Sequence, residues 1–272
     1  MRLKATNKPE DKIINLIGTR IVLFTVTTFF FTIVLALLQE ALTIDYHYIV
    51  LPQWGPGIAA LLLSFTLYKK ALNESLKIKG LTLHKILIST LLPIGLIVVS
   101  LILYNIYLLL PLNLEKVDIT FFYIVIPATL FGAVGEALGW RAFLQSSISQ
   151  KFNHFTAAIL VGFLWGLWHV GHYGNGIVFM IFFLIFTISF SIILSYIIRA
   201  HAYNLFYATS FHFGANIGFY IFFRVNINDT SMIMMNAIIW LLGAVLVLIT
   251  DKRQHAKLIK ISNIKDINGL RI

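Results

Sequence analysis

The chain alternates long apolar runs with short polar connections. Eight apolar runs lie roughly at 15–38, 51–68, 86–110, 119–145, 155–172, 176–198, 203–223 and 231–250. Several approach twenty residues, the length with which an α-helix crosses the hydrocarbon core of a bilayer. Lipid offers the backbone no hydrogen bonds, so such runs fold as helices. The pattern predicts an all-α fold, a polytopic membrane helical bundle with about eight transmembrane helices.

The connections between these runs differ in charge. Lys and Arg occur before the first run, after the second, fourth and sixth runs, and in the tail 251–272, which holds six of the 21 basic residues. The connections after the first and third runs carry few of them. Basic residues collect on the cytoplasmic side of a membrane, so eight spans with both termini in the cytoplasm fit the alternation. A count of six or seven spans would break it.

Composition supports a membrane protein and changes how the net charge is interpreted. Hydrophobic residues make up 59% of the 272 positions and charged residues 12%, and mean hydropathy is +0.87. The formal charge of +10 belongs to loops and tail, with no basic stripe interleaved with aromatics, so no nucleic-acid partner is expected. Cysteine is absent, which excludes disulfides and thiolate metal sites.

The domain organisation is simple. No internal repeat or low-complexity linker interrupts the chain, so we expect a single integral membrane domain over 1–272. The first apolar run is longer than that of a cleaved signal peptide and is expected to remain as a span. The tail 251–272 is basic and is expected in the cytoplasm, either solvated and frayed or lying on an anionic membrane surface.

A few ionisable side chains fall inside the apolar runs. Glu136 is the only acid deep within one, and Arg141 follows it. His169, His172 and His212 lie in the fifth and seventh runs. A charged group at membrane depth costs roughly 2.5–3.5 kcal/mol on insertion scales, so such residues usually face a cavity or one another. A single membrane histidine is more often an interhelical hydrogen-bond partner, which is the interpretation for His172.

Spacing predicts which of these groups meet. His212 and Asn216 are one helical turn apart and share a face. If the fourth and fifth runs form a hairpin turning near Asn153, Glu136 lies 17 residues before the turn and His169 lies 16 after it, at the same depth. Glu136 and Arg141, five residues apart, are offset by about 140° on an α-helix, so Arg141 should brace a neighbouring helix or the cytoplasmic surface. A carboxylate facing an imidazole in a cavity is suited to activating water.

Three motifs in these runs resemble the CAAX-protease and bacteriocin-processing family of intramembrane endopeptidases, also called the Abi family. The family pattern is Glu-Glu-x-x-x-Arg, then Phe-x-x-x-His, then His-x-x-x-Asn or His-x-x-x-Asp. This chain has Glu-Ala-Leu-Gly-Trp-Arg at 136–141, Trp-Gly-Leu-Trp-His at 165–169 and His-Phe-Gly-Ala-Asn at 212–216. The core motifs fall within 119–223.

The resemblance implies an eight-helix fold like that of the type II CAAX prenyl proteases. It implies that Glu136 is a general base activating water with His169, and that His212 and Asn216 bind the oxyanion of the tetrahedral intermediate. Trp140, Arg141 and Trp165 would support this site. No cofactor is expected: zinc was once assigned to the family, but the glutamate mechanism needs no metal.

Partners and location follow from the same resemblance. The substrate would be a peptide or a membrane-protein segment, and the second partner is the lipid bilayer. The bacterial relatives act in peptide maturation or bacteriocin self-immunity. The bias toward Ile, Phe, Lys and Asn fits an AT-rich bacterial source, so the expected location is a bacterial cytoplasmic membrane.

Departures from the family pattern leave two other functions open. Ala137 replaces the second family glutamate, Trp165 replaces the phenylalanine, and Ala142 stands where glycine is common. Ala137 favours a weakened or inactive member that binds a peptide as an immunity or scaffold protein. The third function is a transporter or channel with Glu136 and the histidines as a proton path, but the matched halves typical of transporters are absent.

Overall fold

The computed structural model describes residues 9–46, 49–68, 71–78, 80–109, 119–223 and 228–269. Within α1, α4 and α9, side chains are described only from Ile17, only from Tyr123 and only to Arg253. The described residues are helical and contain no strand. This confirms the predicted all-α class.

The helices follow the apolar runs closely. The elements are α1 (Pro9–Ala41), η1 (Leu51–Trp54), α2 (Gly55–Thr66), α3 (Leu83–Tyr107), α4 (Ile119–Glu136), η2 (Ala137–Gln145), α5 (Ser146–Ile148), α6 (His154–Trp168), η3 (Val170–Asn175), α7 (Ile177–Ile198), η4 (Arg199–His201), α8 (Leu205–Phe223) and α9 (Thr230–Gly269). Five segments of the described chain are long and apolar enough to cross a membrane: Ile17–Ala41, Leu83–Tyr107, Tyr123–Ile148, Ile177–His201 and Thr230–Arg253. The count of eight spans stays a prediction, because α2 and α6 are shorter than a bilayer crossing needs.

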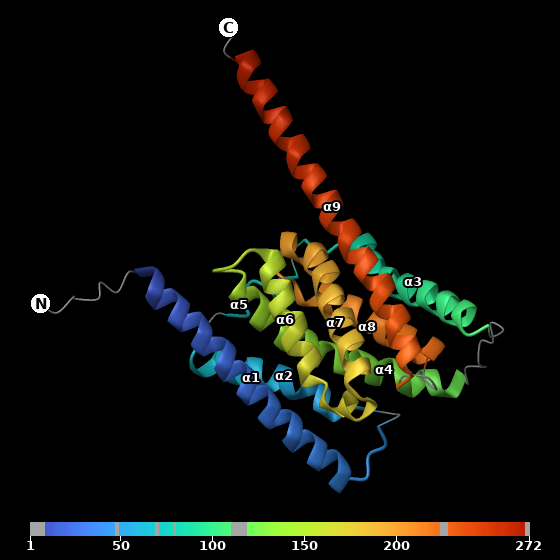
Figure 1. The fold of residues 1–272 in the computed structure, drawn as a ribbon. Coiled ribbons are helices and arrows are strands. Elements are labelled where there is room, and N and C mark those ends of the chain that lie inside the picture. Colours follow the sequence, from blue (N-terminus) through green and yellow to red (C-terminus); the bar gives the residue numbers. More distant parts are fainter. Residues whose placement is uncertain are drawn as a thin grey trace, which may run out of the picture.

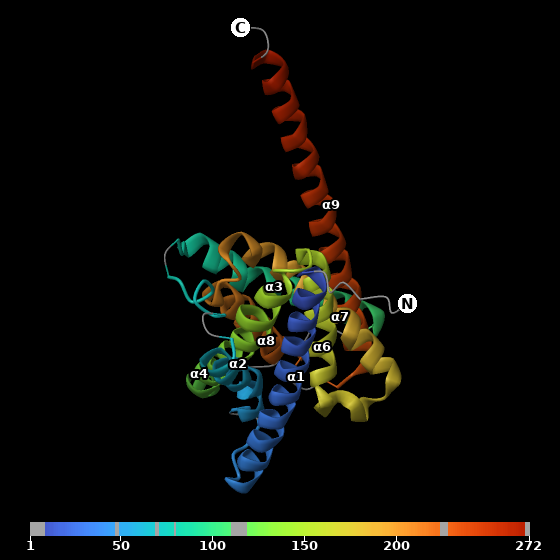
Figure 2. The same cartoon turned by 90° about the vertical axis from the view of Figure 1, so that its left-hand side faces the viewer.

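The helices form one bundle from which the C-terminal end of α9 projects (Figure 1). Within the bundle α3 packs along α8, α6 along α7, α7 along α9 and α1 along α2. The quarter turn in Figure 2 shows the projecting part of α9 standing clear of every other helix. The backbone of α9 is one continuous helix through the basic tail, and the side chains beyond Arg253 lie outside the described residues.

The outer face of α1 shows why the bundle belongs in lipid. Val22, Val26, Phe30, Ile33 and Leu37 recur every three or four residues and are between 57% and 63% exposed. Their spacing places them along one side of the helix. A continuous apolar row of this length would be unfavourable in water and is suited to the acyl chains of a bilayer.

Two glycines let the start of α2 approach the end of α4. A Cβ on Gly139 would lie 2.4 Å from the Cβ of Pro56, and a Cβ on Gly57 would lie 2.9 Å from the carbonyl oxygen of Gly135. Only glycine permits backbones this close. Pro56 stands in the first turn of α2, and the contact brings the preceding η1 segment against α4.

The α4 segment changes its winding directly after Glu136. Residues Ala137–Gln145 form a π-helix, in which hydrogen bonds join residues five apart, rather than a continued α-helix. The predicted offset of about 140° between Glu136 and Arg141 assumed α geometry and is therefore wrong. Such π segments are rare and often occur at functional sites.

Candidate active site

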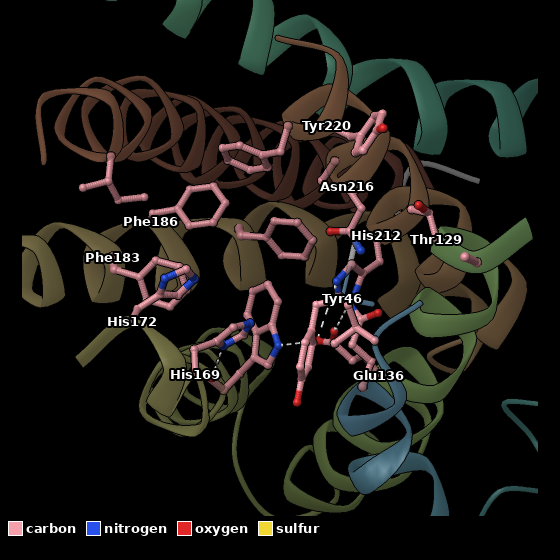
Figure 3. A pocket seen from close by; sticks show the side chains of 18 of the residues that line it. Tyr46, Thr129, Glu136, His169, His172, Phe183, Phe186, His212, Asn216 and Tyr220 are labelled. Carbon is pink, nitrogen blue, oxygen red and sulfur yellow. Dashed lines mark hydrogen bonds and ion pairs between the residues drawn. The ribbon is translucent and has the colours of Figure 1, made fainter. Parts of the chain in front are cut away.

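A cavity of about 490 Å³ lies among η1, α4, α6, α7, α8 and the start of α9, and it contains the predicted residues. Glu136, His169, His212 and Asn216 all line it. In Figure 3, Glu136, His212 and Asn216 gather at one end, and His172, Phe183 and Phe186 lie at the other. The structure thus brings together four polar side chains that the sequence places on three separate runs.

Glu136 is the last residue of α4, and its carboxylate is held from two sides. Its side chain is 1% exposed. Gln53 Nε2 donates to Oε1 at 2.9 Å, and Trp165 Nε1 donates to Oε2 at 2.7 Å. A buried carboxylate is costly unless donors satisfy it. These two neutral donors fix the carboxylate in place at the cavity wall.

Trp165, and not the predicted His169, is the residue of α6 that contacts Glu136 directly. A hairpin turning near Asn153 was predicted to bring Glu136 and His169 together. The turn lies where it was expected, and the Asn153 side chain caps α6 by accepting from the Thr156 N–H at 2.8 Å. Glu136 and His169 do reach the same cavity. The direct partner of the carboxylate on α6 is nevertheless Trp165, one turn earlier.

His169 caps the C-terminal end of α6 rather than lying within a span. Its Nδ1 is 2.7 Å from the carbonyl oxygen of Trp165. A carbonyl oxygen only accepts hydrogen bonds, so Nδ1 must carry the proton, and Nε2 of the neutral ring is left as an acceptor. The rings of Trp165, Trp168 and Phe183 pack edge-on around the imidazole at 4.9–5.2 Å, which fixes its orientation.

His212 and Asn216 come from one face of α8, as their spacing predicted, and both line the cavity. His212 Nε2 is 3.6 Å from Glu136 Oε2, and the side chains are 5% and 1% exposed. A close approach of α8 to α3 sets this position, because a Cβ on Gly214 would lie 2.2 Å from the carbonyl oxygen of Thr90. His172 also lines the cavity and stacks on His169, with ring centroids 6.0 Å apart.

Arg141 braces α7 from inside the bundle. Its Nη1 donates to Ser191 Oγ at 2.8 Å and to Gln145 Oε1 at 3.3 Å. The guanidinium also lies over the rings of Trp165 and Phe190, 5.1 and 5.6 Å from their centroids. The predicted contact with a neighbouring helix is present. At 1% exposure, however, the side chain does not reach a surface.

Two motif residues lie in the core rather than in the cavity. Trp140 is 1% exposed and packs edge-on against Phe24 and Trp168, with centroids 5.3 and 6.0 Å apart. Ala137 is fully buried in the same hydrophobic cluster, and neither residue lines the cavity. Trp140 therefore supports the site by packing α1 and α6 around the π-helix.

Gln53 is the site residue that sequence reasoning missed. It lies in η1, and its amide packs against Gly132 of α4. Only glycine leaves room for it there, because a Cβ on residue 132 would lie 1.9 Å from Gln53 Oε1. A neutral glutamine side chain gives no sequence indication that it belongs to a site, because uncharged polar residues are common near the ends of apolar runs. The only indication was its position just before the Pro-Gly start of α2.

The described side chains of the site do not form a set of metal ligands. Within the described residues, no three His, Cys, Asp or Glu side chains come together as a metal site would require. The carboxylate oxygen nearest His212 already accepts from Trp165, and His169 Nδ1 donates to a carbonyl. Zinc sites use three or four converging N, O or S ligands, which these described side chains do not supply.

Comparison with known proteins relates part of the chain to one protein family. Residues 118–218 match the family model described as type II CAAX prenyl endopeptidase Rce1-like. Curated relatives include the lysostaphin resistance protein A of Staphylococcus aureus strains Newman and USA300, each 29% identical over 227 residues. The alignments cover 80% of this chain and 53% of each relative, so the chain spans about half the length of the curated relatives it matches.

The match covers α4, the π-helix, α6, α7 and α8 as far as Gly218, and so includes Glu136, His169, His212 and Asn216 but not Gln53. Together with the five long apolar helices of the described residues, this similarity supports a multi-pass membrane protein. Through residues 118–218, the chain is similar to the Rce1-like type II CAAX prenyl endopeptidases.

Proposed function

We propose that the protein is an intramembrane endopeptidase that hydrolyses a peptide bond with a water activated by Glu136 and His169. The observation that carries the proposal is the buried carboxylate at the cavity wall, held by Gln53 and Trp165 and 3.6 Å from His212. A membrane-embedded acid fixed by neutral donors, facing space rather than a cationic partner, is arranged to accept a proton.

The reaction follows from the roles of these side chains. The carboxylate of Glu136 takes a proton from water while the acceptor Nε2 of His169 orients that water. The oxygen adds to the peptide carbonyl, and His212 and Asn216 donate hydrogen bonds to the oxyanion that forms. Such preorganised donors typically contribute ~3–4 kcal/mol. The C–N bond then breaks, and the proton held by Glu136 passes to the departing nitrogen. No metal takes part.

The proposed setting is a bacterial cytoplasmic membrane with both termini in the cytoplasm. Its support is the alternation of basic connections along the sequence. The proposed partners are a peptide or membrane-protein substrate and the bilayer, without nucleic acid. Peptide maturation and bacteriocin self-immunity are the proposed roles, and the curated relatives, which are named for resistance to lysostaphin, support the second.

A second candidate is a non-catalytic member that binds a peptide as an immunity or scaffold protein. Ala137, in place of the second family glutamate, favours it. Its burial in the core weighs against it, because the position contributes nothing to the cavity wall. The acid that the reaction needs, Glu136, is present.

Substitution of the proposed base separates the two candidates. The full chain, reconstituted in lipid nanodiscs, is tested on internally quenched apolar peptides. We expect Glu136→Gln to lower kcat/KM by roughly 10²–10⁴-fold, the usual contribution of a general base, without loss of folding. Glu40→Gln, an exposed carboxylate at the end of α1, is the matched control and should leave the rate unchanged. Wild-type rates in Glu136→Gln would refute the endopeptidase, and peptide binding without cleavage by the wild type would favour the second candidate.

A further inference from the structure

A row of phenylalanines on α7 forms one wall of the cavity. Phe179, Phe183, Phe186 and Phe190 recur every three or four residues, and all four line the cavity. Successive ring centroids are each 6.1 Å apart, which makes the row continuous. At 1.5 Å per residue the row extends for about 16 Å, the length of roughly five residues of extended peptide.

The row leads directly to the polar end. Phe190 at its end contacts the rings of Trp165 and His212, with centroids 4.9 and 5.7 Å apart. Phe183, nearer the other end, contacts His169 at 5.0 Å. In Figure 3 the labelled Phe183 and Phe186 lie away from Glu136, with His169 below them. A chain bound along the row would therefore pass beside the residues of the proposed reaction.

The charge of the cavity limits what can bind there. Among the described lining residues, Glu136 is the only acidic residue, and no Lys or Arg is present. The other ionisable groups of the lining are histidines and tyrosines. Arg141, the buried arginine five residues after Glu136, does not line the cavity and donates to Ser191 and Gln145. A substrate carboxylate, in a side chain or at a chain terminus, would be buried without a counter-charge, which is strongly unfavourable. A lysine would find only the carboxylate of Glu136, which the proposed reaction uses.

We propose that the aromatic row, Phe179–Phe190 on α7, is a specificity subsite for an uncharged internal stretch of polypeptide with a bulky apolar side chain next to the scissile bond. The inference rests on the proposed endopeptidase and names its substrate class. The polar donors at one end suit a peptide bond, and the row buries the neighbouring side chain. The absence of lysine and arginine from the described lining favours an internal segment over a chain terminus that ends in a carboxylate.

The test compares peptides that differ at one position. Internally quenched peptides with blocked ends carry Phe, Leu, Ala, Asp or Lys at the central position, and one version of the Phe peptide ends in a free carboxylate beside that position. With the wild type in nanodiscs, we expect Phe and Leu peptides to be cleaved with kcat/KM at least about tenfold above Ala, the discrimination that an apolar pocket provides. Asp, Lys and free-carboxylate peptides should fall below Ala. Equal cleavage of the Asp or Lys peptide overturns the inference.

Variants in the row assign the preference to these side chains. Phe183→Ala and Phe186→Ala should reduce the preference for Phe over Ala by about tenfold, and Phe183→Leu should retain most of it. Phe163→Ala is the control, because Phe163 on α6 is 43% exposed and does not line the cavity. Thermal melts confirm that each variant folds. A Phe preference that survives both alanine substitutions overturns the inference.

Binding measurements keep this inference separate from the proposed function. If the wild type cleaves none of the peptides, the proposed endopeptidase fails, and binding of the same peptides, measured by fluorescence anisotropy, decides the subsite. Tighter binding of the Phe peptide that Phe183→Ala removes supports the subsite without catalysis. Equal binding of all peptides, or their displacement by a long-chain fatty acid regardless of sequence, overturns it.

Discussion

Gln53 offers the sharpest test of how the carboxylate is held. Its amide is one of two neutral donors to Glu136, at 2.9 Å from Oε1. A hydrogen bond to a charged group contributes ~1.5–3 kcal/mol. At 1.36 kcal/mol per factor of ten, Gln53→Ala should lower kcat/KM by about 10–150-fold. Gln53→Glu should lower it further, because it replaces the donor with a second acceptor beside the carboxylate.

The assay is cleavage of the Phe peptide by the full chain in nanodiscs, with a thermal melt of each variant. Gln150→Ala, at an exposed turn position before α6, is the matched control and should leave both readouts unchanged. Gly132→Ala should reproduce the Gln53→Ala loss, since the added Cβ occupies the space of the Gln53 amide. The two losses should not multiply in the double variant, because both act through one hydrogen bond. A loss under about threefold in Gln53→Ala, or multiplying losses in the double variant, would refute this account.

Three further outcomes are expected. Trp165→Phe keeps an aromatic ring but removes the N–H donor to the carboxylate, so kcat/KM should fall about 10–150-fold. Trp240→Phe is the control, because the buried Trp240 N–H has no partner among the described residues, and it should leave cleavage unchanged. Equal effects of the two substitutions would refute the role of the Trp165 N–H. Gly139→Ala should lower stability in a thermal melt by about 1–3 kcal/mol, because the new Cβ would lie 2.4 Å from the Cβ of Pro56. Gly95→Ala is the control and should be neutral in the same melt, because a Cβ there would meet nothing within 4 Å. Arg141→Lys should lower the melting temperature, since an ammonium group does not reproduce the flat guanidinium that lies over the rings of Trp165 and Phe190. An unchanged melt would contradict the bracing role.

The fold class was within reach of the sequence because lipid imposes a simple rule. Apolar length alone predicts helices, and each of the eight runs corresponds to helical segments of the structure. Helix length inside a run was harder to predict. The fifth run contains a helix that ends at Trp168, because His169 leaves helical geometry with ψ of 58°. The predicted run extended to residue 172 and so included the start of the mixed segment Val170–Asn175, which the structure winds as a separate short helix.

The sequence predicted which residues line the candidate site but only some of the contacts between them. Counting residues from the turn placed Glu136 and His169 at one depth, and both line the cavity. Depth alone does not decide which side chain faces the carboxylate. Rotation about α6 does, and it turns the Trp165 N–H toward Glu136. Listing Trp165 only as a replacement for the family phenylalanine missed this hydrogen bond, because a phenylalanine has no N–H donor.

The sequence by itself determined which residues bear charge inside the membrane, their depth and the face they share on α8. These follow from apolar length and helical period, which are local properties of the chain. Only the tertiary structure decided that η1 supplies Gln53, that Ala137 lies in the core and that α7 lines the cavity with phenylalanines. These depend on the rotation of each helix and on close approaches at glycines, which local periodicity does not encode.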